Sequence, residues 1–244
     1  MPSSIKCLNC GAILAEAVGP CKQCGGPIEL SVSLTGVECK GFAGQVGTVN
    51  DSPTSVGGRR ISYTAPTGAR SDASQTGDRL VIQVEPPIDV GTRGESRVLA
   101  CVVANLAMAG ISSTVLPADD QAGEDRILQI AGDRVTLQIV TATPDASFWK
   151  RVSKGATEVH AELSEAAEWI NTAISEKARL YPSEFKSCML LAVDVGHMGV
   201  LADSALGTHY LQSYSDPTTR HGFGGVWLVG PTESNVLRLG GSRW

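Results

Sequence analysis

The sequence predicts mixed α and β structure, arranged as a small cysteine-rich N-terminal module, a flexible linker and a larger α/β domain. The first observation is that five of the seven cysteines lie within residues 1–50. The second is that residues 51–77 are rich in Gly, Ser, Thr, Pro and Asp, and such a segment buries too little apolar surface to offset its ordering entropy. The third is that the pattern turns regular and apolar from Asp78, and residues 78–244 are long enough for one domain.

The composition excludes several classes of protein. Of the 244 residues, 42% are apolar and 18% are charged, which can fill a core and excludes wholesale disorder. The longest apolar run, Val98 to Ile111, is shorter than the ~20 residues that a membrane span needs, and the start MPSSIKCLNC has no apolar signal core. We therefore expect a cytoplasmic protein with no membrane partner. The net charge of −5 argues against a chain that mainly coats nucleic acid.

The strongest motif is a doubled C-x-x-C, in which ten residues separate the pair Cys7 and Cys10 from the pair Cys21 and Cys24. Each pair on a tight turn points two sulfurs at one centre, so the two pairs supply four thiolates to a tetrahedral zinc ion. Glycine follows each pair and relieves the backbone where amides turn toward the sulfurs. Four thiolates leave no position open for water, so this zinc would be structural.

Over about residues 5–40 this arrangement resembles a zinc ribbon with rubredoxin-like knuckles. Two other interpretations are open, namely two disulfides or a redox C-x-x-C. The absence of a secretory signal disfavours disulfides, and a redox motif would normally sit at a helix start within a thioredoxin-like unit. The alternation from Ile28 to Leu34 predicts a strand after the second knuckle, and Cys39 is interpreted as a small core residue rather than a fifth thiol ligand.

The elements of the large domain follow from its apolar periodicity. The run from Glu95 to Ala109 is apolar nearly all round and predicts a buried helix, with Glu95 at the positive end of its dipole. Residues Leu163 to Leu180 predict an amphipathic helix with Ser164 as N-cap. Ala131-Gly132-Asp133 predicts a hairpin turn. The predicted strands are Arg79–Val84, Arg126–Ile130, Val135–Thr141, Met189–Val193, Val226–Val229 and an edge hairpin at Asn235–Leu239.

This order of helix, two-stranded hairpin, helix, strand and strand resembles the restriction-endonuclease-like PD-(D/E)xK superfamily over residues 78–232. The resemblance implies a three-layer domain. It also implies a divalent metal held by an acid on the first helix, an Asp that opens the second strand, and an acid-x-Lys on the third strand. In that chemistry the metal lowers the pKa of the attacking water, and the lysine helps to position or activate it.

The motif residues of that superfamily are only partly present here. Glu95 matches the helix acid, and Asp125 matches the strand aspartate, with Asp119 and Asp120 as alternatives. Gln138 stands where the third-strand acid is expected, and glutamine is a poorer metal ligand than a carboxylate. Val140 stands where the lysine is expected and cannot help to activate water, although Lys150 or Lys154 could reach back. The implied catalytic set Glu95, Asp125 and Gln138 is therefore degenerate.

Other candidate residues have structural interpretations of equal or greater weight. Asp194 ends an apolar strand with His197 just after it, where α/β sites are commonly built, but a satisfied loop pair explains both. Trp149 stands among basic residues and could stack a base, although anchoring a helix to the core is the simpler role. The remaining histidines are interpreted as surface or packing residues, and three arginines as solvating the linker. These are His160, His209, His221, Arg59, Arg60 and Arg70.

Two functional hypotheses of different classes follow. The first is a non-catalytic recognition protein, in which a zinc ribbon is tethered to a degenerate nuclease-like domain that binds nucleic acid or a protein partner. The second is a nuclease that depends on Mg²⁺ or Mn²⁺ and whose acid or lysine has migrated. An enzyme of small molecules built at Asp194 is a third interpretation with little specific support. The sequence favours the first hypothesis and leaves the oligomeric state open.

Overall fold

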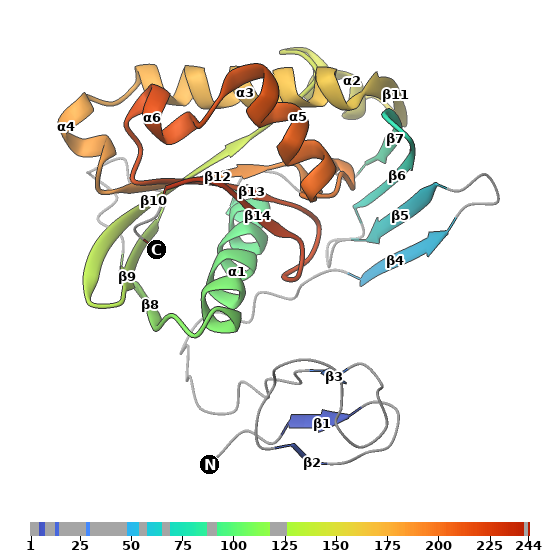
Figure 1. Ribbon diagram of the computed structural model, residues 1–244. Coiled ribbons are helices and arrows are strands. Elements are labelled where there is room, and N and C mark those ends of the chain that lie inside the picture. Colours follow the sequence, from blue (N-terminus) through green and yellow to red (C-terminus); the bar gives the residue numbers. More distant parts are fainter. Residues whose placement is uncertain are drawn as a thin grey trace. The chain divides into compact units, whose positions relative to one another are not determined.

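The computed structural model describes residues 5–7, 13–14, 28–29, 48–53, 58–64, 69–86, 92–117, 126–241 and 244. The chain divides into two compact units, Met1–Ala43 and Gly44–Trp244, whose elements are labelled in Figure 1. Helices and sheets are mixed in the second unit, so the protein is of the α+β class, as the sequence predicts. The sequence placed the end of the N-terminal module at residue 50, and the division between the two units falls seven residues earlier, after Ala43.

The described part of the first unit is a three-stranded antiparallel sheet. Its central strand β1 (Ile5–Cys7) pairs with β2 (Ile13–Leu14) on one side and with β3 (Ile28–Glu29) on the other. Cys7 lies opposite Ile28, so β1 ends at the edge of the sheet where β3 begins. The predicted strand from Ile28 is present over its first two residues, and the rest of it lies outside the described residues.

The second unit is built on a mixed six-stranded sheet with the order β14-β13-β12-β10-β9-β8. The three inner strands β10, β12 and β13 run parallel, and the others pair antiparallel with their neighbours. β12 and β13 are buried at every residue, which explains why they stand out in the sequence as unbroken apolar runs. The strands are β8 (Ser113–Leu116), β9 (Arg126–Ile130), β10 (Asp133–Thr141), β12 (Met189–Asp194), β13 (Gly225–Val229) and β14 (Val236–Gly240).

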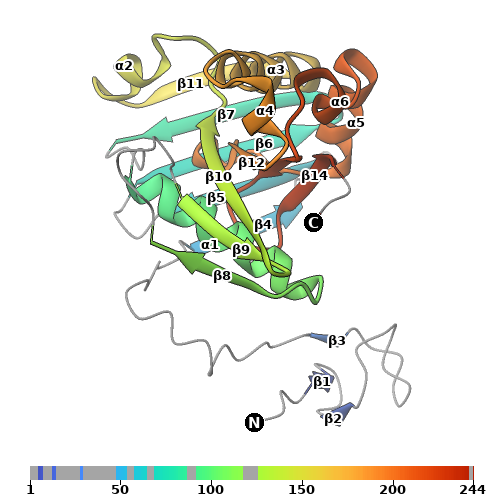
Figure 2. The same cartoon turned by 90° about the vertical axis from the view of Figure 1, so that its left-hand side faces the viewer.

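Helices cover both faces of this sheet, as Figures 1 and 2 show. On one face α1 (Thr92–Met108) shares a buried apolar cluster with Leu137 and Leu190. On the other face α3 (Leu163–Arg179) and α5 (Ser204–Tyr214) share a cluster with Leu191. Leu190 and Leu191 therefore show the alternation of a strand buried on both sides. The short helices are α2 (Phe148–Val152), α4 (Ser183–Lys186), the 3₁₀ turn η2 (Gly196–Met198) and α6 (Pro217–His221).

A second, antiparallel sheet of five strands has the order β11-β7-β6-β5-β4. Its inner face contributes Ala73, Leu80 and Ile82 to the apolar cluster beneath α3. The outer face carries polar side chains, and the Ser62 hydroxyl donates a hydrogen bond to the Asp72 carboxylate across β5 and β6. The strands are β4 (Thr48–Pro53), β5 (Arg59–Thr64), β6 (Arg70–Thr76), β7 (Arg79–Glu85) and β11 (Thr157–Glu162).

The expectation that residues 51–77 form a flexible linker is wrong for most of that range. The range includes the end of β4 and the whole of β5 and β6, which pair with each other and with β7 over continuous registers. Composition misleads here because only one face of the sheet is buried. Ile61 and Tyr63 alternate with exposed or half-buried polar residues, and the backbone hydrogen bonds do not depend on side-chain polarity.

Most elements predicted for the large domain are confirmed within a few residues. The hairpin turn joins β9 to β10, and Ala131 and Gly132 both have positive φ, as a two-residue primed turn requires. The N-cap predicted for α3 is wrong. Glu162 occupies that position, and its backbone N–H donates to Glu165 Oε2 at 2.8 Å. None of the helices within the described residues is long and apolar enough to cross a membrane.

Candidate functional site

Asp194 lies at the carboxyl edge of the parallel strands, which is a common place for α/β sites. It is the last residue of β12 and is aligned with Thr141 on β10 and Val229 on β13. Along β12 its alternation matches Leu190 and Ala192, which pack in the cluster beside α1. The Asp194 side chain therefore faces α1, and Arg97 of that helix meets it there.

Arg97 and Asp194 form a buried ion pair, with side chains that are only 3% and 4% exposed. Arg97 Nη2 donates to Asp194 Oδ1, and Arg97 Nη1 donates to the Gly230 carbonyl at 2.7 Å. The same Oδ1 accepts from the backbone N–H of Gly196 at 2.9 Å and of His197 at 3.3 Å. Asp194 thus holds both α1 and the η2 turn against the sheet edge.

The electrostatics of this pair favour charge on both members. Burial by itself would raise the pKa of Asp194, but the Arg97 guanidinium outweighs it and holds that pKa well below its usual range. Burial would lower the pKa of Arg97, and Asp194 outweighs that in turn and raises it. Cys101, one helical turn after Arg97, has a thiol pKa raised to about 12, mainly by burial. That thiol is protonated near neutral pH and is a poor nucleophile.

His197 lies beside the ion pair, and its ring is buried without a hydrogen bond from either nitrogen to the described residues. Its side chain is 2% exposed, its Nδ1 is 3.6 Å from Asp194 Oδ2, and its ring centroid is 4.9 Å from that of Trp149. Within the described residues neither ring nitrogen has a hydrogen-bond partner. The sequence predicted a satisfied pair of Asp194 and His197, and this is wrong for His197: the two side chains are close, but 3.6 Å is longer than a good hydrogen bond and Asp194 pairs with Arg97 instead.

A close approach of two glycines builds the backbone around this cluster. A Cβ atom added to Gly196 would lie 2.2 Å from the carbonyl carbon of Gly230, so only glycine fits where η2 passes the end of β13. Gly230 is also the residue whose carbonyl accepts from Arg97. The two glycines therefore let the ion pair, the η2 turn and the strand end meet in one small volume.

The residues predicted for a nuclease centre do not all come together. Glu95 lies in the first turn of α1, where its Oε2 is 3.6 Å from Arg126 Nη2. Gln138 is fully buried on the opposite face of the sheet, and its Oε1 accepts a hydrogen bond from the Tyr181 hydroxyl at 2.7 Å. The α1 face of β10 carries Val135 and Leu137 instead. Asp125, Asp119 and Asp120 lie outside the described residues.

The zinc ligands fall mostly outside the described residues. Cys7 ends β1, and the sequence places Cys10 between β1 and β2, with Cys21 and Cys24 shortly before β3. Both C-x-x-C pairs are therefore adjacent in sequence to the sheet edge where Cys7 and Ile28 are aligned. Among the described residues alone, no group of three or more His, Cys, Asp or Glu side chains could hold a metal.

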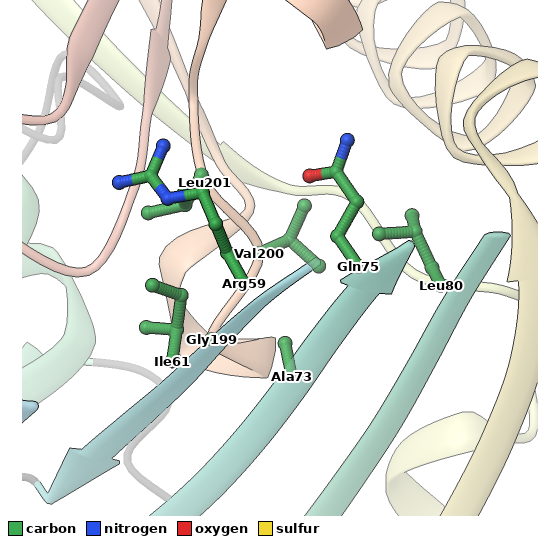
Figure 3. A pocket seen from close by; sticks show the side chains of 8 residues that line it. All are labelled: Arg59, Ile61, Ala73, Gln75, Leu80, Gly199, Val200 and Leu201. Carbon is green, nitrogen blue, oxygen red and sulfur yellow. The ribbon is translucent and has the colours of Figure 1, made fainter. Parts of the chain in front are cut away.

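A small pocket opens near η2, between the loop that follows it and the five-stranded sheet (Figure 3). Its floor is apolar, and Arg59 and Gln75 extend from its sheet side. The cavity volume of about 10 Å³ is room for about one water molecule. The pocket is therefore too small to hold an organic substrate. Its lining is Arg59, Ile61, Ala73, Gln75, Leu80, Gly199, Val200 and Leu201.

Two of the remaining histidines have local partners, whereas the buried Nε2 of His221 has no hydrogen-bond partner within the described residues. His160 Nε2 is 2.6 Å from Glu158, and His209 Nε2 is 3.3 Å from Asp78. Trp149 packs half-buried against the core and against His197, as a helix anchor would. Sequence reasoning missed Arg97, although one arginine inside an otherwise apolar helix was the available signal, since a buried charge needs a partner.

Comparison with known protein families, with curated proteins and with solved structures finds no match to this chain.

Proposed function

We propose that this chain is a zinc-binding recognition protein without nuclease activity, whose large domain has a restriction-endonuclease-like fold and binds nucleic acid or a protein partner. The fold proposal is supported by the element order in the second unit. Helix α1, the hairpin β9–β10, helix α3 and the strands β12 and β13 follow one another as in that superfamily, with helices on both sheet faces.

The observation that carries the non-catalytic part of the proposal is the position of Gln138. In the superfamily, the acids of the first helix and of the third strand bind one ion. Here Gln138 faces away from α1 and its oxygen is held by Tyr181, while the α1 side of β10 is apolar. Glu95, near Arg126, and Gln138 therefore lie on opposite sides of the sheet. Asp194 offers no substitute, because Arg97 already neutralises it.

The zinc part rests on the donor chemistry. Cys7, Cys10, Cys21 and Cys24 would hold a zinc ion through four thiolates, and the metal would supply folding energy rather than catalysis. The pairing of β1 with both β2 and β3 fits such a module, since one cysteine pair lies next to each partner strand in sequence. A thiolate zinc site is stable in a reducing compartment, which supports a cytoplasmic location.

The test is a cleavage assay on labelled single- and double-stranded DNA and RNA in Mg²⁺ or Mn²⁺. We expect no metal-dependent cleavage by the full chain. A Glu95→Gln/Asp125→Ala double variant, purified in parallel, reports contaminating nuclease. Cleavage by the wild type that disappears in this variant would overturn the proposal and establish the nuclease hypothesis.

A further inference from the structure

The ring of His197 is buried without using its hydrogen-bonding groups. Its side chain is 2% exposed, and within the described residues neither ring nitrogen has a hydrogen-bond partner. A neutral imidazole has one donor and one acceptor, and burial of both without partners is destabilising. The ring is held in place through the backbone, because the N–H groups of Gly196 and His197 donate to Asp194 Oδ1 and fix the η2 turn.

An acceptor for one of the two nitrogens lies close by. His197 Nδ1 is 3.6 Å from Asp194 Oδ2, whereas Arg97 donates to the other oxygen, Oδ1. A shift of roughly 0.7 Å brings Nδ1 to hydrogen-bonding distance of Oδ2. Burial by itself would raise the pKa of Asp194, but the Arg97 guanidinium outweighs it and holds that pKa well below its usual range. A protonated His197 therefore has an ionised acceptor beside Nδ1 even in mild acid.

The other nitrogen, Nε2, has no acceptor among the described residues. A protonated imidazole carries a donor on both nitrogens, so Nε2–H needs water. The indole of Trp149 packs against the ring, with centroids 4.9 Å apart and planes inclined at 50°. Phe148 and Val152 anchor α2 with fully buried side chains, whereas Trp149 is only half-buried. Trp149 is thus the side chain of this helix that loses least buried contact when it moves.

Two charges act on the ring, since Asp194 favours its protonation and Arg97 opposes it. The inner faces of β6 and β7 pack against η2 and carry no titratable side chain. The other titratable groups of the surrounding elements are either exposed to solvent or uncharged at neutral pH. They are Asp145, Lys150 and Arg151 at α2, Glu233 after β13, Tyr63 of β5 and Cys101 of α1. His197 is therefore the group at this place whose charge changes between about pH 8 and pH 5.

We infer that His197 is a proton-operated switch that sets the position of the Trp149 side chain. In the neutral state the imidazole packs against the indole, as the structure shows. In mild acid the ring takes one proton from solvent, Nδ1–H donates to Asp194 Oδ2, and water displaces the indole to reach Nε2–H. The ion pair with Arg97 persists in both states because it uses the other carboxylate oxygen. This switch goes beyond the proposed recognition function and is independent of the zinc site.

The experiment is a titration of the full chain between about pH 8 and pH 5, followed by NMR of ¹³C-labelled histidine and ¹⁵N-labelled tryptophan. The signals are assigned by their loss in His197→Gln and in Trp149→Phe. We expect the Trp149 indole signal to shift reversibly with the same midpoint as His197, and that of the fully buried Trp227 to stay fixed. In His197→Gln the Trp149 signal should no longer depend on pH. His160→Gln, which changes an exposed histidine of β11, should behave like the wild type.

A second variant gives an answer even if His197→Gln fails to fold. Trp149→Ala opens the ring to water, so His197 should take up its proton at a higher pH than in the wild type. Far-UV circular dichroism should stay constant over the same range, which separates the switch from acid unfolding. The inference is overturned if His197 does not titrate above pH 5, or if Trp149→Ala leaves its midpoint unchanged. It is equally overturned if the Trp149 signal still titrates in His197→Gln, or if helix content falls together with that signal.

Discussion

Arg97 on α1 and Asp194 at the end of β12 are 97 positions apart in the sequence and form an ion pair that is almost wholly removed from solvent. Each ion is compensated by the other and by the backbone groups of Gly196, His197 and Gly230. Such a pair is strongly coupled, because either charge alone would be buried without a counter-ion.

Removing one member of the pair should therefore lower the free energy of unfolding much more than removing both members. Arg97→Met and Asp194→Leu should each lower the free energy of unfolding by about 3–5 kcal/mol. The double variant should recover a large part of that loss. Urea unfolding of the four proteins gives the coupling energy, and additive losses in the double variant would contradict the interpretation.

Stability should depend on pH through Asp194. Its folded pKa is depressed below the unfolded value of about 3.9, so its contribution is present above pH ~4 and is lost as the pH falls through the folded pKa. We expect the wild type to lose more stability between pH 4 and pH 2 than the Arg97→Met/Asp194→Leu protein does. Asp145→Asn is the matched control, because Asp145 also has a lowered pKa but is exposed to solvent. An equal acid response in the wild type and the double variant would exclude Asp194 as its source.

Gly196 should tolerate no side chain. Gly196→Ala places a Cβ against the backbone of Gly230, which cannot move without displacing the end of β13. We therefore expect the free energy of unfolding to fall by an amount at or above the upper end of the ~1–3 kcal/mol typical of overpacking. Gly207→Ala is the comparison, since its Cβ meets the flexible end of Leu237 and the helix gains about 1 kcal/mol from alanine. Thermal melts compare the two, and an equal loss in both would refute the argument.

The hairpin turn between β9 and β10 contains a strained alanine. Ala131 has φ of 50°, a region in which asparagine is better tolerated than alanine. Ala131→Asn should raise the free energy of unfolding by about 0.5–1 kcal/mol, and Ala131→Val should lower it. Chemical denaturation measures both changes, and the same sign for the two variants would show that the backbone angle is not the cause.

The full chain should contain one zinc ion. Cys10→Ser should abolish it, because three thiolates are insufficient to close the site, while Cys39→Ser should keep it. Elemental analysis with a thiol assay measures the stoichiometry. Chelation should also unfold residues 1–43 and leave the cooperative melt of the larger unit unchanged. A chain that retains zinc after Cys10→Ser would remove that residue from the ligand set.

The parts of the fold that were predictable are those with a strong local pattern. β12 and β13 are apolar at nearly every position, α1 and α3 show helical spacing, and the Ala131-Gly132 turn has the chemistry of a hairpin. The polar strands β5 and β6 were missed because long-range pairing with β7, rather than their own composition, orders them.

The candidate site was less predictable for a similar reason. Asp194 and His197 were visible as polar residues after an apolar strand. Their partner Arg97 depends on how α1 crosses the sheet, and no local pattern encodes that crossing. The face on which Gln138 lies likewise depends on the register of β10, which the sequence alone leaves undetermined.

Strand β11 joins the two sheets of the larger unit in a way that limits how the protein can be divided. It follows β10 in the chain and precedes β12, yet it pairs with β7 in the other sheet. The five-stranded sheet is therefore not a separate appendage, because one of its strands lies between two strands of the other sheet in the chain. A chain that begins at Asp78 would lack β4, β5 and β6 and would leave the edge of β7 that pairs with β6 without a partner strand. The smallest part of the chain that contains every strand of both sheets begins at or before Thr48.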